Sequence, residues 1–168
     1  MAFGYVPDHA CILRGVKKLP AGHHLTLQQG RPLPAPVRYW DIDYSKRARG
    51  SQAELSEELL RLLRQGVTSR MVADVPLGAF LSGGVDSSAV VALMAESSRQ
   101  PVKTCSIGFD VAAVDESAYA ERIARRFATD HRSRKVAADD FGLIDTLAYH
   151  FDEPFADASA LPTYRVCE

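Results

Sequence analysis

The sequence predicts an α/β protein, a three-layer parallel sheet preceded by a β-rich segment. Beyond Ser51, segments with helical periodicity alternate with short apolar runs, as in strand–helix–strand units. A glycine-containing turn, Ser82-Gly83-Gly84, stands between one such run and an apolar helix. Residues 1–44 instead hold five of the nine prolines and show little helical periodicity. We therefore expect two domains, 1–45 and 46–168, joined by a polar linker near residues 43–51.

The composition excludes several functions. The 168 residues carry 20 basic and 21 acidic side chains, a formal net charge of −1, so nucleic acid is not an expected partner. No apolar run approaches the roughly 20 residues of a membrane helix, and the first residues do not resemble a signal peptide. We expect a cytoplasmic protein. Three widely spaced cysteines, Cys11, Cys105 and Cys167, form neither a disulfide framework nor a zinc site and are expected to be ordinary thiols.

The first region is predicted to be extended. Residues 24–28 (His-Leu-Thr-Leu-Gln) alternate polar and apolar side chains with the period of a strand, and Gln29-Gly30 offers a turn after it. Pro32, Pro34 and Pro36 then exclude both a helix and a central strand. About 44 residues with this pattern cannot close a core alone, so we expect the end of a larger domain.

The second region opens with a predicted helix. Ser51 and Glu54 fit a capping box, in which each side chain accepts a hydrogen bond from the backbone of the other residue. Apolar residues then recur at i+4 spacing, and Asp74-Val75-Pro76 is expected to end the helix. The apolar stripe comprises Leu55, Leu59, Leu63, Val67 and Met71.

The most informative stretch, residues 82–88, follows a predicted buried strand at Leu77–Leu81. Two glycines let a backbone approach an anion, while the amides and dipole of the following helix favour negative charge. The stretch has neither the lysine of a Walker A motif nor a G-x-G-x-x-G pattern. It therefore predicts a different phosphate-binding loop. Further strands are expected at Val102–Ile107 and, as an edge, around Arg134–Val136.

Asp86 within this loop predicts a divalent cation. A carboxylate among phosphate-binding amides would repel the ligand unless a cation stands between them, and Mg²⁺ is the ordinary bridge. The alternative is that Ser82 or Asp86 only caps the helix.

Residues 82–88 resemble the pyrophosphate-binding PP-loop of ATP pyrophosphatases. Five further segments resemble the glutamine-dependent asparagine synthetases and their amidotransferase relatives, namely 74–81, 106–109, 115–120, 129–131 and 152–164. Upstream, residues 3–7 and 18–23 resemble the end of that family's glutaminase domain. The resemblance implies a PP-loop, Rossmann-like fold of the adenine-nucleotide α-hydrolase type. Residues 1–45 would then be a glutaminase remnant, and residues 46–168 the N-terminal part of the ATP-binding domain.

The resemblance also implies individual roles. The loop would hold the pyrophosphate of ATP, Asp86 would ligate Mg²⁺, and the backbone at Phe80 and Ile107 would flank adenine. The implied binding residues are Phe80, Leu81, Ser82, Gly83, Gly84, Val85, Asp86, Ser87, Ser88 and Ile107. Asp115, before a helix that carries Tyr119, Ile123 and Phe127, is either a further member or only a helix cap.

The reaction implied is adenylation of the side-chain carboxylate of aspartate, or of a related carboxylate, followed by attack of ammonia derived from glutamine. Holding the charge of the departing pyrophosphate favours this step. The resemblance also allows a homodimer of the full-length enzyme.

The chain departs from the family pattern in two places. The family's glutaminase uses an N-terminal cysteine nucleophile, whereas this chain starts Met1-Ala2, and a second phosphate- and metal-binding motif is expected beyond Glu168. We therefore expect no certain catalytic residue, at most weak ATP binding, no complete reaction by this chain alone, and an exposed strand edge at Leu77–Leu81. Three alternatives stay open: another PP-loop amidotransferase, a β-lactam-forming synthetase, and an inactive fragment.

Overall fold

The computed structural model describes residues 3–110, 115–136, 141–157 and 159–167. The chain divides into two compact units, one of Met1–Ala48 with Asp145–Asp157 and one of Arg49–Ile144 with Ala158–Glu168. Met1-Ala2, on which the expectation of a missing nucleophile rests, lies outside the described residues. Over the described ranges, no helix has the length and apolar character needed to cross a membrane.

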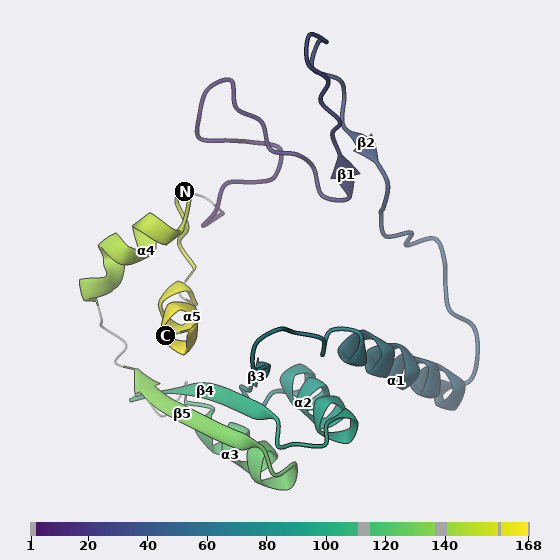
Figure 1. Cartoon of the computed structure of the whole chain (residues 1–168), viewed down its shortest axis with the longest axis vertical. Helices are drawn as coiled ribbons and strands as arrows, with labels where there is room; N and C mark the ends of the chain where they lie inside the picture. Colours follow the sequence, from purple (N-terminus) through teal and green to yellow (C-terminus); the bar gives the residue numbers. More distant parts are fainter. Residues whose placement is uncertain (1–2, 111–114, 137–140, 158, 168) are drawn as a thin grey trace. The chain divides into compact units, whose positions relative to one another are not determined.

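The larger unit is built on a parallel sheet of three strands (Figure 1). Strand β3 (Gly78–Phe80) pairs with β4 (Lys103–Phe109), and β4 pairs with β5 (Asp130–Val136). All three predicted strands are present, and β3 forms one edge of the sheet, as expected. Strand β5 begins at Asp130, earlier than the predicted Arg134. The sequence did not predict this start because the first residues of the strand are polar and mostly exposed.

Two helices link the strands and cover one face of the sheet. Helix α2 (Val85–Ser97) joins β3 to β4, and α3 (Ser117–Arg126) joins β4 to β5. The core between them and the sheet consists of Leu81, Val91, Ala120 and Ala124, with Ala79 and Ile123 packed against it. Helix α5 (Ala160–Cys167) contacts β4 and β5, and Figure 1 shows it on the side of the sheet away from α3. The α/β class is thus confirmed.

Helix α1 (Gln52–Thr68) starts where the capping box predicts. The Ser51 amide donates to Glu54 Oε2 at 2.7 Å, and the Glu54 amide donates to Ser51 Oγ at 3.3 Å. The prediction that the helix continues to Asp74 is wrong. The Ser69 hydroxyl and the Arg70 guanidinium donate to the Gly66 carbonyl at 3.1 and 2.9 Å. The Arg70 amide donates to the Val67 carbonyl at 3.0 Å instead of to Gly66, so the helical pattern ends there.

The smaller unit holds a two-stranded antiparallel ladder, β1 (His23–His24) with β2 (Val37–Arg38). The predicted strand over residues 24–28 is wrong beyond His24, because no described strand pairs with residues 25–28 and Leu27 stays exposed. The predicted turn is present: the Arg31 amide donates to the Gln28 carbonyl at 3.1 Å. A 3₁₀ turn (Phe141–Leu143) and helix α4 (Ile144–His150) follow later in the chain.

Residues 152–157 pack within this same unit against the start of the chain. Lys18 Nζ lies 2.5 Å from Glu153 Oε2 and also donates to the Val6 carbonyl at 2.9 Å. The Ala156 amide donates to the Gly4 carbonyl at 2.7 Å. Two segments far apart in the sequence are thereby joined in one compact body.

Candidate nucleotide-binding site

The turn between β3 and α2 is held tightly against α3. The Leu81 amide donates to the Cys105 carbonyl at 2.9 Å, which fixes the start of the turn on the sheet. Gly83 then adopts a φ of +82°, in the left-handed region, and a Cβ there would lie 2.5 Å from the Ala120 amide nitrogen. Only glycine satisfies both the conformation and the close approach, so the turn can pass over the first turn of α3.

The hydroxyls of the turn shape it from within. Ser82 Oγ accepts from the Gly84 amide at 3.3 Å and lies 3.0 Å from Ser87 Oγ. Ser88 Oγ is enclosed and has no hydrogen-bond partner among the described residues, so it does not face the solvent as a donor. The first amide bonded inside α2 is that of Ser88, which donates to the Gly84 carbonyl at 3.0 Å. The amides of residues 85–87 therefore have no carbonyl within the helix and are oriented to receive an anion.

Asp86 lies in the first turn of α2 and is exposed. Within the described part of the chain its carboxylate makes no hydrogen bond or ion pair, so it is not the cap that was the alternative reading. The described residues contain no group of three or more histidine, cysteine, aspartate or glutamate side chains that could hold a metal. A cation at Asp86 would thus need ligand oxygens from elsewhere, which suits Mg²⁺ bound through one carboxylate and phosphate oxygens.

A cavity of about 300 Å³ opens beside the turn, at the carboxyl ends of β3 and β4. Four residues predicted for the site line it: Phe80, Leu81, Ser82 and Ile107. The remaining predicted residues, 83–88, form the turn and the start of α2 and do not line this cavity. The lining residues that sequence reasoning did not assign to the site are Cys105, Ser106, Phe109, Glu116, Ser117, Ala120, Pro162, Thr163 and Val166.

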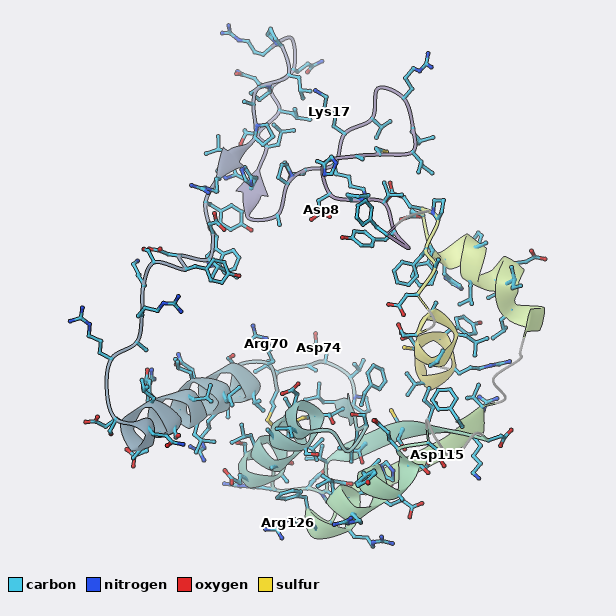
Figure 2. The ribbon with its side chains drawn as sticks, turned by 180° about the vertical axis from the view of Figure 1, so that it is seen from behind. Asp8, Lys17, Arg70, Asp74, Asp115 and Arg126 are labelled. Atoms are coloured by element: carbon cyan, nitrogen blue, oxygen red, sulfur yellow. The ribbon has the colours of Figure 1, made fainter. Side chains whose placement is uncertain are left out.

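Asp115 joins the end of β4 to the start of α3. Its Oδ1 accepts from the Ser117 amide at 3.1 Å and from the Phe109 amide at 3.4 Å. A Cβ at Gly108 would lie 2.9 Å from the same oxygen, so the strand passes closely under this carboxylate. The Ser117 hydroxyl, followed by the Ser117 amide, holds the pKa of Asp115 below its usual range. These contacts hold the backbone just before α3, whose N-cap residue is Glu116 and has no side-chain cap hydrogen bond. Figure 2 shows Asp115 at the opposite end of α3 from Arg126.

The three cysteines are free thiols. Cys105, on β4, lines the cavity, and burial raises the pKa of its thiol, with a smaller contribution from Cys167. Cys11 is half-buried and Cys167 exposed.

A strand, a glycine turn packed on a neighbouring helix, and free amides at a helix start, all beside an apolar cavity, are typical of α/β domains that bind nucleotides. The family model for asparagine synthase matches residues 58–168, and the chain belongs to this family.

Curated relatives agree with this family. The chain is 38% identical to "Putative asparagine synthetase [glutamine-hydrolyzing] 2" of Methanocaldococcus jannaschii, over 99% of this chain and 32% of that protein. It is 28% identical to asparagine synthetase [glutamine-hydrolyzing] 1 of Bacillus subtilis, over 100% of this chain and 26% of that protein. It is also 28% identical to amidase chyE of Penicillium rubens, over 92% of this chain and 26% of that protein. The chain therefore spans a quarter to a third of the length of these relatives.

Proposed function

We propose that the chain belongs to a ligase that amidates a carboxylate at the expense of ATP, releasing AMP and pyrophosphate. Residues 46–168 would begin its PP-loop ATP-binding domain, and residues 1–45 would end its glutaminase domain. The observation that carries the proposal is the Ser82–Gly84 turn, which presents unbonded α2 amides next to a cavity large enough for a base.

The turn binds the phosphates. The amides of residues 85–87 and the positive end of the α2 dipole hold the two phosphates that leave as pyrophosphate. Gly83 lets the backbone of the turn lie close to α3, which leaves space for a phosphate. Phe80 and Ile107 flank the base. Asp86 would hold Mg²⁺, which when bound neutralises phosphate charge.

The carboxylate substrate attacks the α phosphate and becomes an acyl-adenylate, which ammonia opens to the amide. Adenylation turns a poor leaving group into a good one, and holding the pyrophosphate charge lowers the barrier to its departure. The substrate we propose is aspartate, with ammonia from glutamine, because the asparagine synthetases of M. jannaschii and B. subtilis match along the entire chain.

A second candidate is amidation of a carboxylate other than aspartate. The match to amidase chyE over 92% of this chain favours it, since a protein with a different name matches nearly the same stretch. Both candidates share the adenylation step and differ in the acceptor.

The binding step is tested by titrating the ¹⁵N-labelled chain with Mg-ATP to millimolar concentration. We expect weak binding, with the amide signals of residues 82–88 shifting most. Asp86→Ala should abolish the dependence of ATP binding on Mg²⁺ without altering the amide signals of the core. Asp8→Ala, at an exposed aspartate in the other compact unit, should preserve that dependence. Parent-like Mg²⁺ dependence in Asp86→Ala would remove the metal role of Asp86.

The reaction is tested in a chimera in which this chain replaces the aligned third of the M. jannaschii relative. We expect release of AMP and pyrophosphate that depends on aspartate and ammonia and is lost with Asp86→Ala. Turnover with another carboxylate but not with aspartate would favour the second candidate. A folded chimera that turns over no carboxylate would contradict both.

A further inference from the structure

Two neighbouring carboxylates at the start of α3 have different surroundings. The Asp115 carboxylate accepts hydrogen bonds from the amides of Ser117 and Phe109. Glu116 makes no hydrogen bond or ion pair of its side chain within the described residues, and it lines the cavity beside the turn. Of these two acids, Glu116 and not Asp115 is among the residues that line the cavity.

Among the described residues that line this cavity, Glu116 is the one with a charged side chain. The other polar groups there are hydroxyls, from Ser82, Ser106, Ser117 and Thr163, and the rest is mostly apolar. A carboxylate accepts hydrogen bonds and cannot donate them. The Glu116 carboxylate repels phosphate and makes no favourable contact with the π-face of a base. Its partner in a bound nucleotide must therefore be a hydrogen-bond donor.

We infer that Glu116 is a specificity-determining residue that accepts hydrogen bonds from the ribose hydroxyls of the nucleotide. Glu116 follows β4, the strand next to the one that ends in the phosphate-binding turn. In dinucleotide-binding α/β folds an acidic residue near the end of the neighbouring strand binds the ribose 2′-hydroxyl for the same geometric reason. The inference rests on the proposed nucleotide binding and adds selection of ribonucleotides over deoxyribonucleotides.

The test compares ATP with 2′,3′-dideoxy-ATP in the parent chain and in Glu116→Ala, by chemical-shift titration with Mg²⁺ present. A ratio of dissociation constants is used because removing Glu116 also removes its repulsion of the phosphates, which affects both nucleotides equally. The parent should prefer ATP about three- to tenfold, the contribution of a typical net hydrogen bond, because Glu116 is exposed to water. In Glu116→Ala the ratio should fall to about one.

The matched control is Glu121→Ala, at an exposed glutamate on the same helix that pairs with Arg125 and does not line the cavity. It should keep the parent's ratio. Inosine triphosphate provides a second arm, because it keeps the ribose but lacks the 6-amino donor of adenine.

Several results would overturn the inference. One is an unchanged ATP preference in Glu116→Ala. Another is a Glu116→Ala variant that loses a preference for ATP over inosine triphosphate but keeps the preference for ATP over the dideoxynucleotide. That result would assign Glu116 to the base. Equal, measurable binding of both nucleotides by the parent overturns the ribose contact alone. No binding of any nucleotide overturns the proposed function as well.

Discussion

Gly83 is the residue on which the geometry of the site most depends. Its φ of +82° disfavours any L side chain, and an added Cβ would meet backbone atoms of α3, which cannot rotate away. We expect Gly83→Ala to lower the free energy of unfolding by at least about 2 kcal/mol. Urea denaturation followed by circular dichroism measures this.

Gly84→Ala is the internal control for that loss. Gly84 has a φ of −68°, and its Cβ would meet only the Ser82 hydroxyl, at 3.3 Å. We expect a change below about 1 kcal/mol, since alanine is a poorer N-cap but has fewer unfolded conformations to lose. Equal losses in the two variants would mean that the close approach of the turn to α3 is not what requires glycine.

At the scale of elements, a polar seam joins β4, β5 and the turn before β5. Thr104 Oγ1 lies 2.9 Å from both Thr129 Oγ1 and His131 Nδ1, and Ser106 Oγ lies 3.3 Å from His131 Nε2. Thr104 and Ser106 are buried, so the seam satisfies polar groups that the sheet has removed from water. Both ring nitrogens of His131 therefore have partners on the neighbouring strand.

This seam predicts a pH dependence of stability. Burial lowers the pKa of His131 below 6.5, and Glu121 on α3 opposes this only in part. As the pH falls, the unfolded chain binds the proton first, so the stability that the neutral ring contributes is present above about pH 6.5 and is lost as the pH falls through the lower folded-state pKa. We expect urea denaturation to show a smaller loss of stability between pH 8 and 5.5 in His131→Gln than in the parent.

The same replacement at the exposed His9 controls for the general effect of losing a histidine. We expect His9→Gln to keep the parent's difference between the two pH values. An identical difference in His131→Gln and in the parent would show that the acid sensitivity arises elsewhere in the chain.

The elements differ in how far their bounds follow from local sequence signals. The start of α1, the strands β3 and β4, and the turn before α2 could be predicted, because a capping box, apolar runs and paired glycines are local signals. The end of α1 could not, since it depends on the Ser69 hydroxyl and the Arg70 guanidinium taking the Gly66 carbonyl in place of the Arg70 amide. Nor could the cavity be predicted in full, because Thr163 and Val166 reach it from α5, more than fifty residues beyond β4.

At the site, sequence reasoning predicted the turn before α2 but left open which acid accompanies it. Asp115 and Glu116 are adjacent and chemically alike, so only their contacts show that Asp115 accepts backbone amides whereas Glu116 lines the cavity. The segment 115–120 was recognised from its resemblance alone. The hydrogen bonds of Asp115 to Phe109 and Ser117 are what separate the two roles.

At the scale of the whole molecule, the larger unit leaves β3 with a neighbour on one side only, within the described residues. Beside this edge an apolar groove of about 490 Å³ lies between α1, α2 and β3. Leucines of α1 line it, and α1 has no buried residue. An unpaired strand next to an apolar groove favours pairing with another chain, and a net charge of −1 offers little repulsion against it.

We therefore expect the purified 168-residue chain to self-associate, with a mass that rises with concentration in light scattering. Leu62→Lys should reduce this association, because Leu62 lines the groove and a buried lysine there would lose its hydration. Leu60→Lys is the matched control: Leu60 lies on the same helix, is 51% exposed against 50% for Leu62, and does not line the groove. If both lysine variants shift the mass equally, association occurs through α1 as a whole or by charge alone, and the edge formed by β3 and its groove is not the contact. A parent chain that stays monomeric at all concentrations would show that the edge is too short, at three residues, to pair in solution.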